Sequence, residues 1–451
     1  MGLGAGKTPG RRRDARGRCG RGNHLHVRPP GHLSGPDSCH VPLGLQWDFP
    51  ERSAGSQLAV IGALFRPQTL WRIPMKRRAF LRNGLLALGV PAVLPFDARG
   101  DVLLNPRRRT QSGDPIRLSS NENALGMPPA SRDAILGGMG ETNRYPSSSR
   151  RAVSEALAER HGIPTNGIVL GNGSTEILQM GVQARLDPQL RLVAPAPTFE
   201  DVFEYSEPHP WIDLKPIPLL ADYAHDLTGM EEATRGASGP VLVYVCNPNN
   251  PTGSLTSVAD LESWIQRASD NVHFLVDEAY FEFVDSSAYR SLDKLALDNP
   301  NVVVARTFSK VYGMAGMRLG YAIAHPETAR TLQAFAAGTN CNHLALVAGL
   351  AALGDEEWVG KSVAANLRSR RIAYGALDEL GLEYIPSHTN FVMHRITGDL
   401  QQYIDRMAEA GIRVGRPFPP MLGFNRCSFG LPEEMERWAE TLRGFRQKGW
   451  V

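Results

Sequence analysis

The stretch NVVVARTFSKVYGMAGMRLGYAIA, residues 301–324, contains the lysine around which the rest of the chain is interpreted. Its first eight residues are mostly β-branched or apolar, a composition that predicts a buried strand. Lys310 follows where a parallel strand would open into its loop, and three glycines after it let backbone segments approach closely. Parallel α/β folds build their sites at such strand ends, whereas a lysine in this place is more commonly a solvated surface charge. The other motifs of the chain therefore decide whether Lys310 is interpreted as a site residue or as a surface charge.

Length and composition are those of a globular protein. The chain has 451 residues, 42% hydrophobic and 21% charged, which allows two or three domains and excludes a fibrous or disordered protein. Residues 1–110 carry 19 Lys and Arg against 6 Asp and Glu, a balance of +13, and since the whole chain has +3, the remainder has −10. Few aromatic residues interleave with the arginines of this basic head, so we predict no nucleic-acid binding.

The cysteines give no sign of a disulfide framework or a metal site. Their number is odd and they show no CxxC spacing: they stand at 19, 39, 246, 341 and 427. We therefore expect free thiols and no bound metal.

The N-terminal hundred residues divide into two segments. Residues 1–74 are rich in Gly, Arg and Pro and show no sustained period, which predicts disorder. The following MKRRAFLRNGLLALGVPAVLPF, within 75–100, resembles a twin-arginine secretory signal, with Arg77-Arg78 before an apolar run too short and Pro-interrupted to anchor in a membrane. Such a signal stands at an N-terminus. We therefore expect translation from Met75 and a periplasmic protein; otherwise the likeness is accidental and the protein cytoplasmic.

From residue 116 onward the chain alternates short apolar runs with helical stretches. The runs IVL, LRLVAP, VLVYVC, HFLVD, VVVART and GYAIA predict strands of a doubly wound, mainly parallel sheet. After residue 325 helical patterns dominate, notably at 356–380, before short strands near FVMH, GIRV and RCSF and a last helix from Pro432. We predict an N-terminal arm at 116–145, a large domain at 146–335 and a smaller α+β domain at 336–451.

The motif IVLGNGSTEIL, residues 168–178, predicts a strand, a Gly-rich turn and a helix that begins around Ser174. The free N–H groups and the dipole at such a helix start suit a phosphate group.

Two further strands end in polar residues. VLVYVCNPNNPTG leads into a Pro-punctuated turn that carries Asn250, and FLVDEAYFEF delivers Asp277 at its strand end with Tyr280 close behind. A carboxylate that ends an apolar strand is costly unless a cation pairs with it. A protonated pyridine ring would be such a cation.

Taken in order, the motifs LSSNENALG, GNGSTE, NPNNPTG, DEAYFEF and RTFSK with AGMRLGY resemble those of the fold-type I pyridoxal-phosphate (PLP) aminotransferases of class I and II. Within that group they are most similar to the histidinol-phosphate aminotransferase family, and the resemblance covers about residues 116–447. It implies an α/β fold of PLP-transferase type I with a seven-stranded type of sheet, PLP as cofactor, and an active homodimer.

The resemblance also implies roles for single residues. Lys310 would form the Schiff base with the cofactor aldehyde and then move the substrate proton, and Asp277 would keep the ring nitrogen protonated. Asn250 and Tyr280 would hydrogen-bond the ring oxygen, with Lys310, Asp277 and Tyr280 as the catalytic set.

Further residues would hold the cofactor phosphate and ring. The phosphate would bind to Ser174, Thr175, Ser309 and Arg318. Phe199 would stack on the ring where relatives often have Tyr, its alternative being an ordinary core residue.

Tyr145 matches a tyrosine that reaches the cofactor phosphate of the neighbouring subunit. For the substrate, Arg426 resembles the arginine that grips the α-carboxylate. Arg416 is either a second arginine of the site or a surface charge, and Asn123 of the LSSNENALG motif is assigned to substrate binding.

The segment TNCNHLALVAGLAAL, residues 339–353, departs from the family pattern, in which many relatives have an aromatic-Pro pair. Asn340, Asn342 and His343 would either give the substrate pocket a more polar wall or simply start a helix.

The predicted function is PLP-dependent transamination between an L-amino acid, or histidinol phosphate, and a 2-oxo acid such as 2-oxoglutarate. One alternative is a PLP-dependent decarboxylase of the threonine-phosphate type. Another is a non-catalytic ligand sensor, which would need a DNA-binding module, and residues 1–110 show no helix-turn-helix pattern.

Overall fold

The computed structural model describes residues 114–451. The extension at 1–74 and the signal-like segment at 75–100 lie outside the described residues, so both, and the location that they imply, stay predictions. Within the described part of the chain, no helix is both long and apolar enough to cross a membrane.

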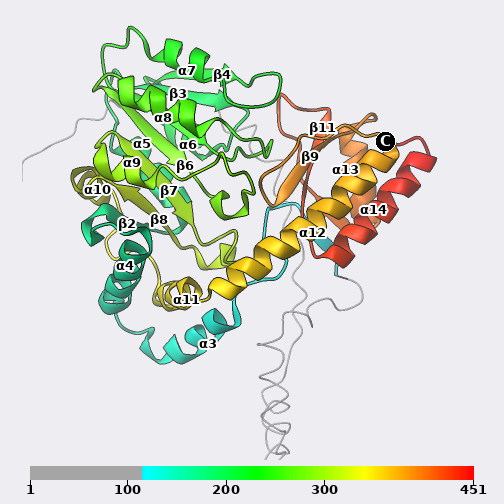
Figure 1. Cartoon of the computed structure of the whole chain (residues 1–451), viewed down its shortest axis with the longest axis horizontal. Coiled ribbons are helices and arrows are strands. Elements are labelled where there is room, and N and C mark those ends of the chain that lie inside the picture. Colours follow the sequence, from blue (N-terminus) through cyan, green and yellow to red (C-terminus); the bar gives the residue numbers. More distant parts are fainter. Residues whose placement is uncertain (1–113) are drawn as a thin grey trace, which may run out of the picture. The chain divides into compact units, whose positions relative to one another are not determined.

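A seven-stranded sheet forms the centre of the larger part (Figure 1), in the order β2-β8-β7-β6-β5-β3-β4. All neighbouring pairs from β4 to β7 are parallel, and β8 alone runs against its two neighbours. The prediction of a mainly parallel seven-stranded sheet is therefore confirmed. The strands are β2 Ile168–Gly171, β3 Arg191–Ala196, β4 Asp213–Pro218, β5 Val241–Cys246, β6 Val272–Asp277, β7 Val302–Thr307 and β8 Gly320–Ala324.

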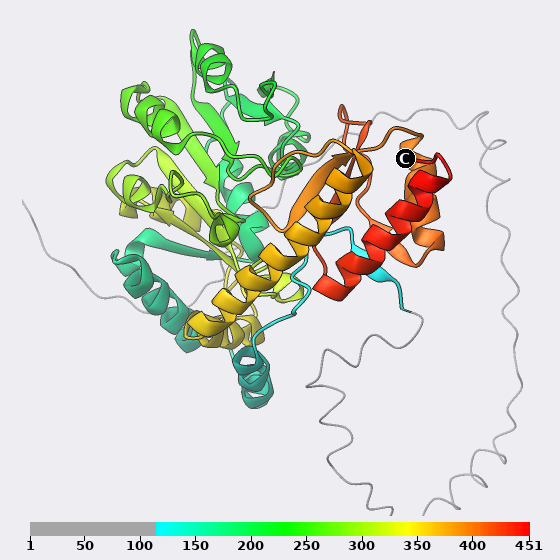
Figure 2. The ribbon, with the colours of Figure 1, turned by 45° about the vertical axis from the view of Figure 1, so that its right-hand side comes forward.

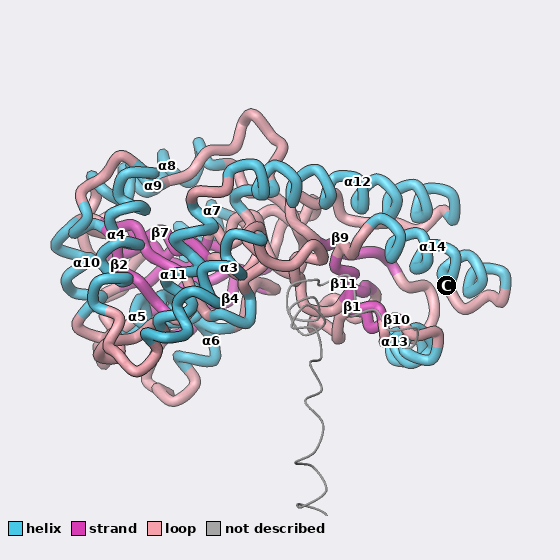
Figure 3. The backbone as a smooth tube through the Cα atoms, turned by 90° about the horizontal axis from the view of Figure 1, so that it is seen from below, coloured by secondary structure: helices cyan, strands magenta, loops and turns pink. Residues whose placement is uncertain are grey.

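The central strands are apolar throughout because helices cover both faces of the sheet. Along β5, Val241, Val243 and Val245 enter one hydrophobic cluster, while Leu242 and Tyr244 enter the other. Figure 3 shows α8 and α9 on one side of the strands and α5 and α6 on the other. The helices of this part are α3 Pro129–Gly138, α4 Ser147–His161, α5 Gly173–Gln183, α6 Asp201–Ser206, α7 Leu227–Thr234, α8 Val258–Arg267, α9 Asp293–Asp298, α10 Pro326–Gln333 and α11 His343–Leu353.

Sequence reasoning missed strand β4. Its sequence DLKPIP contains two prolines and alternates between half-buried and exposed residues. Proline lacks the N–H that an inner strand needs, so it is tolerated here because β4 is the edge strand.

The C-terminal part has a hydrophobic cluster of its own, centred on Trp438, Tyr403 and Leu377. Strand β11 pairs antiparallel with β9, and the arm strand β1 pairs in parallel with β10. The long helix α12 lies against α14 (Figure 2). The expected helix at 356–380 and the helix start at Pro432 are confirmed. The elements are β1 Ile116–Leu118, α12 Glu356–Leu380, β9 Phe391–Arg395, α13 Leu400–Glu409, β10 Ile412–Val414, β11 Phe424–Ser428 and α14 Pro432–Gln447, and short 3-10 turns are η2 Met139–Glu141, η3 Thr165–Gly167, η4 Phe281–Phe283 and η5 Ala315–Met317.

Candidate active site

A cavity of about 700 Å³ lies where the C-terminal ends of β5, β6 and β7 meet residues of the arm and of the C-terminal part. Parallel strands place their carboxyl ends at one edge of a sheet, which explains why motifs far apart in sequence converge there. The sequence-predicted residues that line this cavity are Ser174, Thr175, Phe199, Asn250, Asp277, Tyr280, Ser309, Lys310, Arg318, Arg416 and Arg426.

Lys310 lies three residues beyond the end of β7. Its Nζ donates a long 3.4 Å hydrogen bond to the carbonyl oxygen of Asn121 and lies 5.4 Å from the centre of the Tyr280 ring. Burial, helped by the positive charge of Arg426 and opposed by Asp277, lowers the pKa of Lys310 to about 8. A substantial fraction of this amine is therefore neutral near physiological pH, as a nucleophile or base requires.

Asp277 ends β6 and is only 2% exposed. Its Oδ1 accepts a 3.0 Å hydrogen bond from the N–H of Ala279, and its Oδ2 accepts one of 3.2 Å from the Tyr244 hydroxyl. Burial raises the pKa of Asp277 to about 6, although both hydrogen bonds oppose the shift. No side-chain cation of the described chain forms an ion pair with this carboxylate, so a cationic ligand would relieve the cost of its burial.

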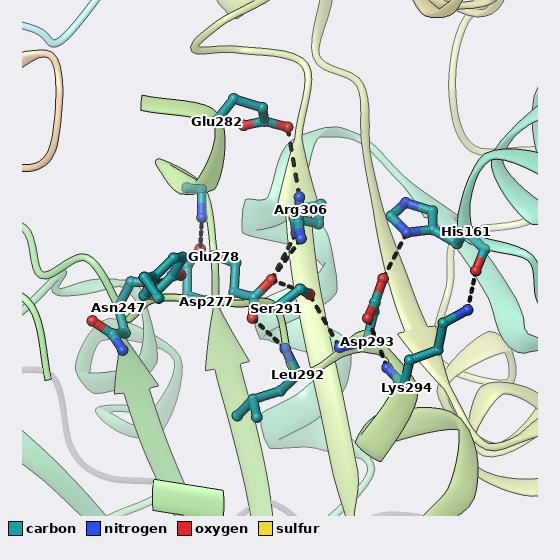
Figure 4. A network of polar contacts seen from close by, with 12 residues as sticks. His161, Asn247, Asp277, Glu278, Glu282, Ser291, Leu292, Asp293, Lys294 and Arg306 are labelled. Carbon is teal, nitrogen blue, oxygen red and sulfur yellow. Dashed lines mark hydrogen bonds and ion pairs between the residues drawn. The ribbon is translucent and has the colours of Figure 1, made fainter. Parts of the chain in front are cut away.

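Starting at Glu278, the residue after Asp277, a buried ionic network joins the ends of β6 and β7 (Figure 4). Glu278 follows Asp277, and its Oε2 accepts 2.8 Å contacts from both Nε and Nη2 of Arg306. The carboxylate also accepts hydrogen bonds from the Ser291 hydroxyl at 2.7 Å and the Leu292 N–H at 2.9 Å. The Arg306 and Glu278 side chains are 5% and 2% exposed, so the network is dry and fully paired.

Sequence reasoning missed this network, although a signal was present. An arginine within VVVART and a glutamate after a buried strand are both charges that burial forbids unless they pair. The N–H of Glu278 also donates to the carbonyl oxygen of Ala305 at 2.9 Å, so side chains and backbone together fix the ends of β6 and β7.

Arg306→Met is expected to lower the free energy of unfolding by about 3–5 kcal/mol, because it leaves the Glu278 carboxylate buried without its cation. Urea denaturation followed by circular dichroism measures the loss. The matched control is Arg443→Met, which breaks an ion pair with Glu379 whose side chains are 41% and 52% exposed. That control should cost less than about 1 kcal/mol. Equal effects of the two variants would contradict a stabilising role for the buried network.

The first turn of α5 provides an anion site. Ser174 and Thr175 line the cavity at the start of this 11-residue helix. Gly173 has a left-handed φ of +79°, and a Cβ on Gly320 would come within 2.4 Å of the Ser174 nitrogen. The missing side chains allow the backbone to pack closely here, and the first N–H groups of a helix, which lack partners within the helix, suit a phosphate.

Arg318 adds a positive charge beside this helix start. Its backbone is left-handed, with φ +58°, and its guanidinium donates to the carbonyl oxygen of Ala315 at 3.0 Å and to the Ser309 hydroxyl at 3.5 Å. Both contacts hold the arginine without neutralising it, so its charge stays available to an anion.

Arg426 is a second cation, on β11 and 8% exposed. Its Nη1 donates to Asn250 Oδ1 at 2.7 Å and its Nη2 to the Ser119 carbonyl oxygen at 2.9 Å, while its buried Nε has no hydrogen-bond partner within residues 114–451. Burial lowers the pKa of Arg426 to about 10, and the positive charge of Arg416 acts in the same direction. A buried guanidinium without a carboxylate partner suits a substrate carboxylate.

Tyr280 and the arm complete this wall of the cavity. The Tyr280 hydroxyl accepts a 3.0 Å hydrogen bond from the amide of Asn121, and burial raises the pKa of Tyr280. Asn121 has a left-handed φ of +54° and accepts a 2.9 Å bond from the Ser428 hydroxyl. The arm therefore contributes Asn121 to the cavity, a residue that sequence reasoning passed over.

The structure does not bring Asn123 into the cavity. Its amide donates to the carbonyl oxygen of Val311 at 2.8 Å and to the Ser362 hydroxyl at 3.0 Å. These bonds tie the arm to its neighbours, so the position of Asn123 gives no support to a role in substrate binding. Within the motif it is Asn121, and not Asn123, that lines the cavity.

Tyr145 is also absent from the cavity lining of the described chain and is 80% exposed. Phe199 lines the cavity and is half-buried. Arg416 lines the cavity as well, and its guanidinium pairs with Glu200. It is therefore both a residue of the cavity and a partly exposed charge, the two possibilities that the sequence left open.

Asn340, Asn342 and His343 are absent from the cavity lining of the described chain. The Asn342 side chain caps the helix by accepting from the Ala345 N–H at 2.8 Å, and His343 is its first residue, with Nδ1 3.2 Å from the Ser149 hydroxyl. Asn340 donates to the carbonyl oxygen of Leu170 at 3.1 Å. In this chain the helix-start interpretation therefore fits better than a polar pocket wall.

The residues of the cavity fit PLP. The α5 start and Arg318 match its phosphate, the buried Asp277 carboxylate matches a protonated ring nitrogen, and the neutral fraction of Lys310 matches its aldehyde. The orphaned Nε of Arg426 points to a further anion, which the substrate would supply.

Comparisons with known proteins agree. Residues 113–442 match the family model "Aminotransferase class I and II". The histidinol-phosphate aminotransferase of Symbiobacterium thermophilum is 36% identical over 341 residues, which cover 74% of this chain and 92% of that protein. The crystal structure of the Sinorhizobium meliloti histidinol-phosphate aminotransferase with PLP superposes with a TM-score of 0.70 at 27% identity, covering 80% of this chain and 97% of that one.

The L-threonine-O-3-phosphate decarboxylase of Porphyromonas gingivalis is also similar, with a TM-score of 0.64 over 74% of this chain and 99% of that one. At 20% identity this likeness shows a shared fold alone and does not favour decarboxylation. Together with the matched family model and the fitted cavity, the relatives show that the chain belongs to the class I and II aminotransferases and is a PLP-dependent aminotransferase.

Proposed function

We propose that this enzyme transfers an amino group between an L-amino acid, or histidinol phosphate, and a 2-oxo acid such as 2-oxoglutarate. The observation that carries the proposal is the presence of Lys310, Asp277 and Arg426 in one cavity. Histidinol phosphate is named because of the similarity to the Symbiobacterium thermophilum enzyme.

The roles of the three residues follow from their surroundings. Bound PLP supplies an aldehyde that reacts with amines and a ring that accepts the electron pair left on the substrate carbon. Lys310 Nζ, in its neutral form, holds the cofactor and can later take up the proton of the substrate α-carbon. Asp277 supplies the buried negative charge for the ring nitrogen. Arg426 orients the substrate through its anionic group, which is the α-carboxylate of an amino acid or the phosphate of histidinol phosphate.

The lowered pKa of Lys310 predicts how cofactor capture depends on pH. Only the neutral amine is a nucleophile, so the rate at which the cofactor-free protein captures PLP should rise with pH and reach half its maximum near pH 8. Stopped-flow absorbance over a pH series measures the rate. Nα-acetyl-lysine, which keeps a free side-chain amine, is measured in the same buffers to correct for the titration of PLP itself. A midpoint near that of an ordinary lysine, about 10.4, would contradict the buried setting of Lys310.

The function is tested by loading the full chain with PLP and mixing it with single amino donors: histidinol phosphate, glutamate and an aromatic amino acid. A donor that is used should abolish the absorbance of the bound aldehyde, and a 2-oxo acid should restore it. Threonine phosphate is tested as a further substrate, and release of carbon dioxide from it without lasting loss of the aldehyde absorbance would favour the decarboxylase instead. An absorbance unchanged by every donor would refute transamination of these substrates.

We also propose that the enzyme is a homodimer. Tyr145 is 80% exposed although it matches a residue that reaches a neighbouring cofactor site. Leu136, Met139 and Leu350, on the packed elements α3, η2 and α11, are 48%, 54% and 38% exposed. Exposed large apolar side chains on elements that pack together support contact with a second copy.

A further inference from the structure

One ion pair of the cavity joins Arg416 and Glu200, neither of which is among the residues assigned to the cofactor. The Arg416 guanidinium, two residues beyond β10, pairs with the carboxylate of Glu200, which directly precedes α6. Both residues line the cavity, and their side chains are 52% and 46% exposed. The pair is therefore more open to solvent than the buried Arg426, and we take it as the region that receives the end of the substrate farthest from its reacting carbon.

The Glu200–Arg416 pair lies beside Arg426, the residue expected to bind the substrate α-carboxylate. Arg416 is 4.3 Å and Arg426 is 4.5 Å from the centre of the same Phe418 ring. Two guanidinium groups on one ring could receive the two ends of a substrate that has two carboxylates. However, the Arg426 guanidinium has no carboxylate partner within the described chain, whereas Arg416 already has one in Glu200.

Because Arg416 has a carboxylate partner and Arg426 has none, the site should distinguish substrates by the charge of the distal group, which is the end farthest from the reacting carbon. A substrate with a single carboxylate binds Arg426 and leaves the Glu200–Arg416 pair intact. A second anion must displace Glu200 from Arg416 and remain close to a like charge, which costs affinity. The inference rests on the proposed function and narrows it.

We propose that Glu200 is a specificity-determining residue that makes this site favour substrates with an uncharged distal group over those with a second anion. Glutamine should then be a better donor than glutamate, relative to an enzyme without this charge. 2-Oxoglutarate can still serve as the acceptor, but it would bind more weakly than it does to a protein that lacks the Glu200 charge.

The test uses two donors of equal size, L-glutamate and L-glutamine, with the full chain loaded with PLP. Glu200→Gln keeps the shape of the side chain and removes its charge. It should raise kcat/KM for glutamate about tenfold, because an exposed ion pair and a like-charge repulsion are both removed. The value for glutamine should change less than about twofold, since no charge meets Glu200 in that substrate. Adding Arg416→Gln should abolish the gain for glutamate.

Glu204→Gln is the matched control. Glu204 lies on α6, four residues after Glu200, and is exposed outside the cavity lining. Its substitution removes the same charge from the same helix region, so it should leave the glutamate-to-glutamine ratio unchanged. An equal gain in this control would mean that overall charge, and not the Glu200–Arg416 pair, is responsible, which would overturn the inference.

A second readout separates this inference from the proposed function. Dissociation constants of glutarate and its monoamide, glutaramate, are measured with the PLP-loaded protein by tryptophan fluorescence, without any turnover. Glu200→Gln should tighten glutarate binding about tenfold and leave glutaramate unchanged. If the wild type transaminates but neither ratio responds to Glu200→Gln, the inference is wrong and the function stands. If no donor reacts, the function fails, and the binding ratio alone decides the inference.

Discussion

Lys310→Ala is expected to give a folded protein that binds PLP without a covalent link and transaminates more than about 10⁴-fold more slowly than the wild type. Lys310 is the one lysine that lines the cavity within the described chain, so no neighbouring amine can replace it. The substitution removes both the group that holds the cofactor and the base that takes the substrate proton. Borohydride reduction followed by mass spectrometry should find PLP attached at Lys310 in the wild type and no attachment in the variant.

Lys361→Ala is the control for this experiment. Lys361 is an exposed lysine of α12 whose Nζ pairs with Glu357 four residues earlier, far from any cavity-lining position in the sequence. Both PLP attachment and turnover should remain at the wild-type level. Turnover close to the wild type in Lys310→Ala would show that the active site lies elsewhere.

Residues that follow their own strand directly could be predicted from the sequence. Asp277 and Lys310 each come at or just after an apolar run, and a parallel sheet brings such strand ends together without further information. Arg426 could be predicted only through the family resemblance, because it reaches Asn250 from 176 residues away.

Other features depend on geometry that the local sequence does not encode. Asn121, and not Asn123, lines the cavity, and Asn121 has a left-handed backbone that the local sequence does not reveal. The Glu278–Arg306 network requires the register between β6 and β7, and the Glu200–Arg416 pair joins residues 216 apart. Pairings of this kind follow from the packed structure, which explains why sequence reasoning missed both.

Asp277→Asn should reduce transamination by about 10³-fold or more, because a neutral amide cannot keep the ring nitrogen protonated, and a preorganised charge in a dry site contributes several kcal/mol. Single-turnover rates with the preferred donor measure the loss. An unchanged rate would show that the cofactor ring does not lie against Asp277.

The same substitution is expected to stabilise the protein when PLP is absent. Burial raises the folded-state pKa of Asp277 to about 6, above the unfolded value of about 3.9. The unfolded chain therefore releases this proton more readily than the folded one. Ionisation of Asp277 lowers the free energy of unfolding above pH 6, and this loss disappears below pH 4.

At pH 7, Asp277→Asn should raise the free energy of unfolding by roughly 2–3 kcal/mol. The stabilities of the two proteins should become equal as the pH falls from 6 to 4. Urea titrations of both cofactor-free proteins at pH 7, 5 and 4 measure the difference. A variant that is less stable than the wild type at pH 7 would mean that Asp277 already has a cationic partner in the free protein, and that its charge is not kept for the cofactor.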